Sequence, residues 1–354
     1  MRTVPDLLTF SLATPETLLH LAPSDDGNFS THTSREQYIT EKSILQLLQS
    51  YGPPTGIPLR ELTLHRQKHI DWLLIGLERL SAGFTTLDAS RPWIVYWIVN
   101  SLDLLGFEFP DGLIDRYMHH VLSPNVITAK MPNSTRRIIE TLARFQCPTG
   151  GFCGGPGQLP HLATTYASVN VLAILATPKA YRIIDRDSMF SFFLSLKQAD
   201  GSFIMHEGGE IDVRGSYCVL SVAYMLDLLT PRLTDGISDF ILKCQSYEGG
   251  FSGSPGVEAH GGYSFCAVAA LEILGKVPQC NLDGLVRWSA SRHMKVEGGF
   301  SGRANKLVDG CYSFWCGSLY PIIEKNLRAL GRVQGDSTID LMNRGMLFPT
   351  FETS

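Results

Sequence analysis

Apolar residues recur at helical spacing through most of the chain, and they do so in pairs of segments. The first segment of each pair has mixed polarity, and the second is richer in Ala, Ser, Gly and aromatic residues. The later pairs are predicted helices at 134–146 and 162–175, 187–198 and 213–229, 234–245 and 262–274, and 282–294 and 307–323. An earlier pair is predicted at 59–80 and from residue 91, where RPWIVYWIVNSL is apolar nearly all round. Such a helix should be buried, so the second helix of each pair is expected to lie inside.

A glycine-rich turn joins the two helices of each later pair, and it recurs every 48 to 51 residues. A tyrosine follows each turn 12 or 14 residues after the phenylalanine that ends it. The turns are Gly150-Gly151-Phe152, Gly201-Ser202-Phe203, Gly249-Gly250-Phe251 and Gly298-Gly299-Phe300, and the tyrosines are Tyr166, Tyr217, Tyr263 and Tyr312. A fixed period of this length indicates one supersecondary unit stacked many times. The prediction is an all-α fold, an α–α barrel (toroid) of helical hairpins with about five of six repeats present.

The two ends of the chain depart from this pattern. Residues 1–35 are rich in Ser, Thr, Pro and Asp and are predicted to form a flexible N-terminal arm, with the barrel at 36–330. Residues 331–354 form an atypical tail without the glycine pair and tyrosine of a sixth repeat. We keep three explanations for the tail: a shortened gene product, a non-catalytic relative, or a partner that replaces the missing wall.

Composition excludes some function classes. The 354 residues are 44% hydrophobic and 18% charged, which suits a globular protein with a large core. The net charge of −4 offers no basic field for nucleic acid, and no apolar run reaches the roughly 18 residues of a membrane span. The first residues lack the features of a signal peptide, so we expect a cytoplasmic protein whose eight cysteines are free thiols.

Polar clusters interrupt the apolar inner helices where each leaves its loop, at 212–217, 258–266 and 302–315. A ring of hairpins would bring these junctions to one mouth. Arg214, His260, Arg303 and Lys306 would make that mouth cationic, which suits a phosphate or diphosphate. Taken alone, each of them is better explained by a surface salt bridge.

Asp309 and Cys311 are candidate metal ligands. One carboxylate and one thiolate, completed by a histidine, would suit zinc with an open fourth position. Taken in isolation, the pair is also explained by a helix-capping aspartate beside a buried cysteine.

Aromatic residues concentrate on the predicted inner helices: Trp93, Tyr96, Trp97, Tyr166, Tyr217, Tyr263, Tyr312 and Trp315. Core packing explains them, but a ring of helices encloses a space that side chains do not easily fill. An aromatic-lined funnel with a cationic rim suits a lipid diphosphate.

Five motifs carry a family resemblance: RPWIVYW, GGPGQLPHLATTYA, DGSFIMHEGGEIDVRGSYC, EAHGGYSFC and EGGFSGRANKLVDGCYSFW. In order and spacing, over about residues 60–325, they resemble the β subunits of protein farnesyltransferases. The resemblance implies an α–α barrel that pairs with a farnesyltransferase α subunit. It also implies transfer of farnesyl from farnesyl diphosphate to the cysteine of proteins ending in a CaaX sequence.

The resemblance implies roles residue by residue. Asp309 and Cys311 match zinc ligands, and His260, Arg303, Lys306 and Tyr312 match residues that bind the diphosphate. Arg214, Tyr217, Tyr263, Cys266 and Trp315 match the wall of the prenyl pocket, and Trp93 matches the bulky floor that favours a C15 donor. The predicted substrate-binding set also includes Trp97, Gly261, Gly262, Ala304, Asn305, Ser313 and Phe314. The resemblance further implies that a zinc-stabilised substrate thiolate attacks C1 of the prenyl chain, and no catalytic general base is assigned.

Two residues of the family pattern are not found in this sequence. The family has a third zinc ligand, a histidine, and an aspartate linked to magnesium assistance in its final repeat. Two protein ligands are expected to hold zinc more weakly than three, and magnesium has no assigned residue here.

Three other functions remain as alternatives. A terpene cyclase would need an acidic D-x-D-D motif, which is absent. An (α/α) glycoside hydrolase would need facing carboxylates, for which Glu210, Asp212 and Glu258 are candidates. A truncated or non-catalytic subunit would bind the lipid diphosphate without a complete zinc site.

Overall fold

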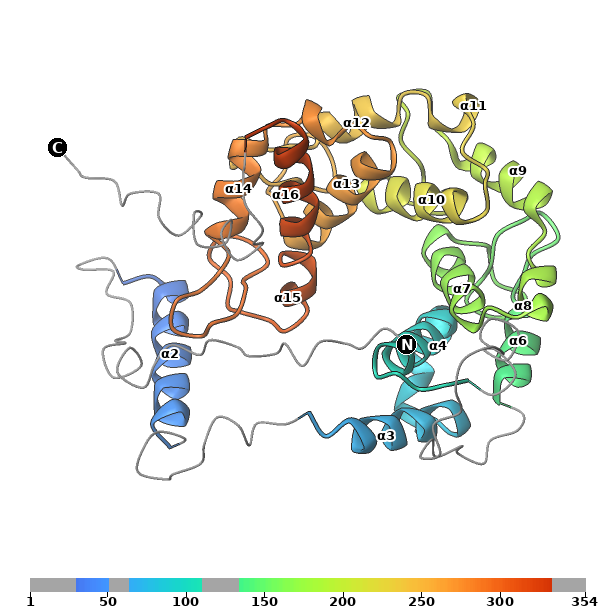
Figure 1. The fold of residues 1–354 in the computed structure, drawn as a ribbon, viewed down its shortest axis with the longest axis horizontal. Helices are drawn as coiled ribbons and strands as arrows, with labels where there is room; N and C mark the ends of the chain where they lie inside the picture. The colour runs from blue at the N-terminus through green and yellow to red at the C-terminus, as the bar shows by residue number, and fades with distance from the viewer. Residues whose placement is uncertain (1–29, 51–63, 110–133, 333–354) are drawn as a thin grey trace.

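The computed structural model describes residues 30–50, 64–109 and 134–332, and the described residues are helical with no strand (Figure 1). The predicted arm up to residue 29 and the predicted tail from residue 333 lie outside them. The elements are α2 His32–Ser50, α3 Arg66–Glu78, η3 Ala82–Ser90, α4 Arg91–Leu104, α6 Ser134–Ala143, α7 Leu162–Leu175, α8 Pro178–Ile183, α9 Arg186–Leu196, α10 Val213–Met225, α11 Pro231–Thr234, α12 Ile237–Lys243, α13 Gly261–Ile273, η4 Val277–Gln279, α14 Leu282–Ala290, α15 Tyr312–Trp315 and α16 Leu319–Ala329.

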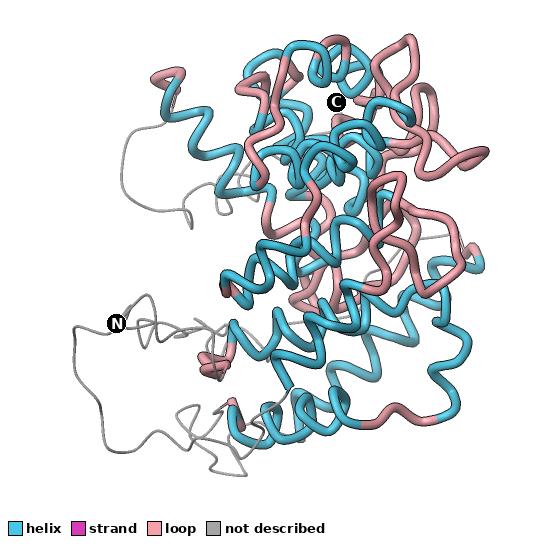
Figure 2. Tube along the Cα trace, turned by 90° about the vertical axis from the view of Figure 1, so that its right-hand side faces the viewer, coloured by secondary structure: helices cyan, strands magenta, loops and turns pink. Residues whose placement is uncertain are grey.

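The helices form a ring of two layers, as the barrel prediction requires. Each inner helix packs on the next around the ring, in the order α4, α7, α10, α13 and α16 (Figure 1). Outer helices, among them α6, α9, α12 and α14, cover the outside. The connecting loops gather on one side of the molecule (Figure 2). The predicted all-α toroid of hairpins is therefore confirmed.

The glycine turns set the spacing of the hairpins. In each turn a backbone N–H donates across the loop to a carbonyl, as from Gln198 to Ser202 at 2.8 Å and from Ser246 to Gly250 at 2.9 Å. Gly249 has a φ of +106°, and a Cβ there would overlap the backbone of Gly284 in the next outer helix. Glycine is needed there because the φ is left-handed and the neighbouring backbone is too close for a side chain.

The phenylalanine after each turn is a core anchor. Phe152, Phe203 and Phe251 are fully buried. The backbone N–H of Phe152 donates to Thr165 Oγ1 at 2.9 Å, and that of Phe251 donates to Ser264 Oγ at 2.8 Å. In each of these two repeats, a side-chain hydroxyl of the inner helix therefore holds the turn against that helix.

The last predicted inner helix was wrong in two respects, and the helices predicted at 213–229 and 282–294 end four residues earlier, at Met225 and Ala290. The helix predicted at 307–323 begins only at Tyr312, because the Asp309 side chain accepts from the backbone of Cys311 and closes a local turn. It is then interrupted between α15 and α16, where Leu319 and Tyr320 donate to carbonyls three residues back.

Helix α2 had no counterpart among the predicted elements. Its Gln37 Nε2 donates at 2.6 Å to Oε1 of Glu297, in the last described turn. Its Glu41 is 1% exposed although it is charged. Helix α2 therefore contacts the ring beside the loop that leads to Arg303.

Candidate functional site

The inner helices begin at one end of the ring, and their first turns are joined to the loops of the next repeat. The N–H of Leu162 donates to Met205 O, that of Val213 to Gly253 O, and that of Gly261 to Gly302 O, at 2.9, 3.0 and 2.8 Å. The side chains of His161, Asp212 and His260 cap α7, α10 and α13. The polar clusters predicted from the sequence therefore do lie around one mouth.

His260 and Tyr312 form the centre of one side of this mouth. Nδ1 of His260 accepts from the N–H of Gly262 at 3.1 Å, and Nε2 lies 3.0 Å from the hydroxyl of Tyr312. Burial, helped by the charge of Arg303, lowers the pKa of His260. In the neutral ring that results, Nδ1 is the acceptor, so Nε2 carries the proton and donates it to Tyr312 Oη. The hydroxyl proton of Tyr312 is thereby left free to donate to a ligand.

The two arginines of the mouth are paired with carboxylates. Arg303 Nη1 lies 3.1 Å from Glu258 Oε2, and Arg214 Nη2 lies 2.6 Å from Asp212 Oδ2 and 3.1 Å from Glu210. Hydrogen bonding to Asp212 raises the pKa of Arg214. The mouth is therefore less positively charged than the sequence predicted, because each of the two arginines is paired with a carboxylate.

The rest of the loop after Gly302 supplies exposed polar groups. Lys306 is exposed and makes no ion pair with the part of the chain that the structure describes. Asn305 has a φ of +57°, which turns the backbone sharply before Lys306. Lys306 therefore keeps its charge available to an anion.

Asp309 and Cys311 are both exposed at the start of α15. Asp309 Oδ1 accepts from the backbone N–H of Cys311 at 2.9 Å, which lowers the pKa of that carboxyl. Partial burial, followed by the nearby Asp309 carboxylate, raises the pKa of the Cys311 thiol. A bound cation would instead lower the pKa of the Cys311 thiol, because it favours the thiolate. Within residues 30–50, 64–109 and 134–332, no group of three or more His, Cys, Asp or Glu side chains is arranged to hold a metal.

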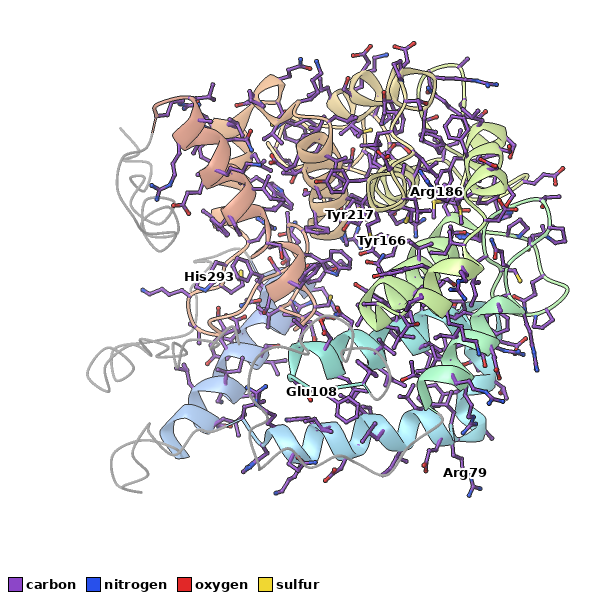
Figure 3. All side chains as sticks on the ribbon, turned by 45° about the vertical axis from the view of Figure 1, so that its right-hand side comes forward. Arg79, Glu108, Tyr166, Arg186, Tyr217 and His293 are labelled. Carbon is purple, nitrogen blue, oxygen red and sulfur yellow. The ribbon has the colours of Figure 1, made fainter. Side chains whose placement is uncertain are left out.

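An unbroken series of aromatic contacts lines the inner side of the ring. Trp93 contacts Trp97, Tyr96 and Tyr166 with ring centroids 5.7 to 5.9 Å apart. The series continues from Tyr166 to Tyr217 at 5.5 Å, to Phe265 at 5.4 Å, and on to Trp315 at 5.4 Å. We call this series, with Phe314, the aromatic wall. Tyr166 and Tyr217 lie toward the middle of the ring, whereas Arg79 lies at its outer edge (Figure 3).

The aromatic wall is accessible although its helices are otherwise buried. Trp97 is 51% exposed and Phe314 is 56% exposed. Helices α7, α10 and α13 are each packed between two inner neighbours, so the half-buried rings of Tyr166 and Tyr217 face the space that the ring encloses. Cys266, assigned to this wall from the sequence, is 6% exposed and belongs to the packed core.

Sequence reasoning missed some members of the site. Phe265 joins Tyr217 to Trp315, but in the sequence it reads as one more core residue. The rings of His161 and His206 lie 5.2 Å apart at the mouth. His161 could have been identified from the sequence, because its helix-capping position aligns with those of Asp212 and His260 in the repeat.

A family model described as the prenyltransferase alpha-alpha toroid domain matches residues 64–347. This chain belongs to the prenyltransferase α–α toroid family. It is 42% identical over 287 residues to protein farnesyltransferase subunit beta of Arabidopsis thaliana, a match that covers 80% of this chain and 55% of the relative. It is 38% identical over 288 residues to the protein of the same name in Schizosaccharomyces pombe, covering 80% of this chain and 69% of the relative.

A solved structure shares the fold. A structure described as Candida albicans protein geranylgeranyltransferase-I complexed with GGPP superposes with a TM-score of 0.60 at 22% identity. The superposition covers 80% of this chain and 82% of that one. At this identity the likeness supports the toroid architecture alone.

The chain spans little more than half the length of its Arabidopsis relative. None of the helices in the described segments combines the length and the hydropathy that crossing a membrane requires.

Proposed function

We propose that this chain is the β subunit of a protein farnesyltransferase, which transfers farnesyl from farnesyl diphosphate to the cysteine of a CaaX sequence. The observation that carries the proposal is the aromatic wall, which leads from Trp93 to the His260–Tyr312 pair. The family membership and the names of the relatives support the same function.

The aromatic wall suits a prenyl chain. An apolar chain lying along Trp93, Tyr166 and Tyr217 would leave water for a surface built from ring faces and edges. Each buried CH₂ contributes about 0.8 kcal/mol, so fifteen carbons could supply on the order of 10 kcal/mol before entropic costs. The hydroxyls of Tyr166 and Tyr217 lie 3.4 Å apart, so they are paired with each other rather than turned unpaired to the lipid.

The mouth suits the diphosphate. Tyr312 donates its hydroxyl proton because His260 occupies the acceptor side of that hydroxyl. Burial raises the pKa of Tyr312, so the group stays protonated and remains a donor. Arg303 and Lys306 add positive charge, and the Glu258 carboxylate orients Arg303.

The residues at the start of α15 supply part of the ligand set that zinc requires. Asp309 and Cys311 would hold the ion with one oxygen and one sulfur ligand, and in the described segments these are the two donors that the site supplies. When bound, zinc would stabilise the thiolate of the substrate cysteine. Magnesium, retained as an option from the sequence, has no residue assigned to it.

The reaction follows from this placement of charge. The substrate sulfur forms a bond to C1 of the farnesyl chain while the bond from C1 to the diphosphate oxygen breaks. The electron pair of that bond leaves with the diphosphate, where Arg303, Lys306 and Tyr312 stabilise the growing negative charge. No group of the protein has to accept a proton in this step.

The heterodimer with an α subunit and the cytoplasmic location belong to the same proposal. The test is transfer from labelled farnesyl diphosphate to a CaaX peptide by the chain co-purified with an α subunit. We expect the unmodified chain to be active and Cys311→Ser to lose about 100-fold or more of the rate while still binding farnesyl diphosphate. The matched control is Cys147→Ser, a half-buried cysteine outside the mouth, which should stay within about twofold.

The outcomes separate the candidate functions. Absence of farnesyl diphosphate binding by the unmodified chain would refute the proposal. Binding without transfer would favour the alternative of a non-catalytic lipid-diphosphate-binding subunit.

A further inference from the structure

The turn between α6 and α7 carries two cysteines, one on each side of the glycine pair Gly150-Gly151. Cys147 and Cys153 directly follow Gln146 and Phe152, the two residues that pair across the turn as an antiparallel bridge. Side chains alternate between the two faces of an extended chain. Both thiols therefore lie on the face of the turn opposite the bridged side chains.

The two thiols share one hydrogen-bond acceptor. Sγ of Cys153 lies 3.1 Å from the carbonyl oxygen of Phe145, and Sγ of Cys147 lies 3.9 Å from the same oxygen. Burial, and then the neighbouring Cys153, raise the pKa of the Cys147 thiol to about 11. Cys147 is half-buried, whereas Cys153 is 2% exposed. One thiol is therefore accessible to a small molecule in solution, and the second lies beside it in the core.

A bond between the two sulfur atoms would leave neither of the carbonyls that the thiols contact without a donor. Sγ of Cys153 also lies 2.8 Å from Gly155 O. When the S–H groups are lost, Phe145 O still accepts from the backbone N–H of Cys153 at 2.9 Å, and Gly155 O still accepts from that of Gln158 at 3.2 Å. A buried acceptor that loses its last donor is costly, and here neither acceptor does. The turn can therefore lose both thiol protons at little cost.

A later repeat carries serines at the same two positions. Ser246 and Ser252 stand where Cys147 and Cys153 stand, and their backbone N–H groups donate across the turn in the same way, both at 2.9 Å. The Ser252 hydroxyl donates at 3.0 Å to the carbonyl of Cys244, as the Cys153 thiol does to the equivalent carbonyl. The geometry of the turn therefore needs neither sulfur, and the fold already accepts serine at each position.

We propose that Cys147 and Cys153 form a dithiol site that a low-molecular-weight disulfide converts reversibly to a disulfide bond. The Cys147 thiolate attacks one sulfur of the oxidant, forms a mixed disulfide and releases one thiol. The Cys153 thiolate then attacks the Cys147 sulfur and releases the second thiol. The two protein thiols are oxidised, the oxidant is reduced to two thiols, and these carry away the two protons.

The native turn favours the second of these steps. The fold already holds both sulfur atoms beside one carbonyl oxygen, so closing the bond orders little further chain. The mixed disulfide is therefore not expected to accumulate. The inference is independent of the proposed function, because neither cysteine lies at the mouth.

The experiment uses the full chain and oxidised glutathione at about pH 8.5, which ionises more of the thiols than neutral pH does. Remaining thiols are blocked by alkylation, and peptides are mapped by mass spectrometry. Cys147 and Cys153 should be linked to each other in most molecules, and dithiothreitol should reverse the link. In Cys153→Ser, Cys147 should instead keep a glutathione adduct. In Cys147→Ser, Cys153 should remain a free thiol because it is buried.

Thermal melting tests whether the fold accepts the bond. The oxidised chain should melt no lower than the reduced chain, with a gain of roughly 2–5 °C from closing a short loop. Cys147→Ser treated in the same way is the matched control, because it retains adducts at the exposed Cys311.

Two results would refute the proposal. One is a mapped chain in which Cys147 and Cys153 carry separate glutathione adducts or both remain free thiols. The other is a linked chain that melts clearly below the treated control, which would show that the bond distorts the turn.

Discussion

Gly302 holds the Tyr312 hydroxyl in place by having no side chain. A Cβ at Gly302 would overlap Cζ and Oη of Tyr312, the atoms that reach His260. Gly302 also accepts from the N–H of Gly261 at the start of α13, so the loop cannot easily move away. In Gly302→Ala the Tyr312 ring must therefore leave its position, and the hydroxyl loses both His260 and the diphosphate.

The size of the effect follows from the lost hydrogen bond. A hydrogen bond to a charged group contributes about 1.5–3 kcal/mol, and each 1.4 kcal/mol is tenfold in affinity. We expect Gly302→Ala to weaken binding of farnesyl diphosphate by roughly ten- to a hundredfold. Tyr312→Phe should have a similar effect because it removes the hydroxyl alone, and the double variant should lose little more.

The assay is equilibrium binding of labelled farnesyl diphosphate, with thermal melting to verify that each variant is folded. The matched control is Gly299→Ala in the same loop, where a Cβ would meet Val308 at an ordinary 3.7 Å. Its affinity should stay within about twofold. Unchanged affinity in both Gly302→Ala and Tyr312→Phe would show that this hydroxyl does not bind the diphosphate.

Three further predictions concern the wall, the mouth and the turns. Trp93→Thr removes a ring that contacts Tyr166 and should shift donor preference toward C20 by roughly tenfold or more, and an unchanged preference would contradict that role. Burial holds the pKa of His260 in the folded protein below its usual 6.5. The contribution of His260 to the stability of the fold is therefore present above pH 6.5 and is lost as the pH falls through the folded-state pKa. Melting temperatures between pH 7 and 5 should therefore fall less in His260→Asn, which keeps a capping side chain. In urea unfolding, Gly256→Ala should cost about 1–2 kcal/mol for its left-handed φ alone. Gly249→Ala should cost clearly more, because its Cβ also overlaps backbone, and equal costs would show that the overlap relaxes.

The repeat and most of its helices could be predicted from the amino-acid sequence. Helix α7 spans the predicted 162–175, because helical periodicity, a capping residue and a flanking turn are all local signals. The turn glycines were identified for the same reason, since a left-handed φ and a close backbone leave few other residues. The grouping of the polar clusters at one mouth followed from repetition, which places equivalent positions of successive hairpins at the same end of the ring.

The contacts between side chains of different repeats could not be predicted from the sequence. Tyr312 contacts His260 from 52 residues away, and Arg303 pairs with Glu258 from 45 residues away. Periodicity predicts which end of a helix a residue occupies, but not the direction of its side chain or the charge that faces it. The charge of the mouth and the inclusion of Phe265 in the aromatic wall depend on those directions, because electrostatic and packing energies are set by distances between residues far apart in the sequence.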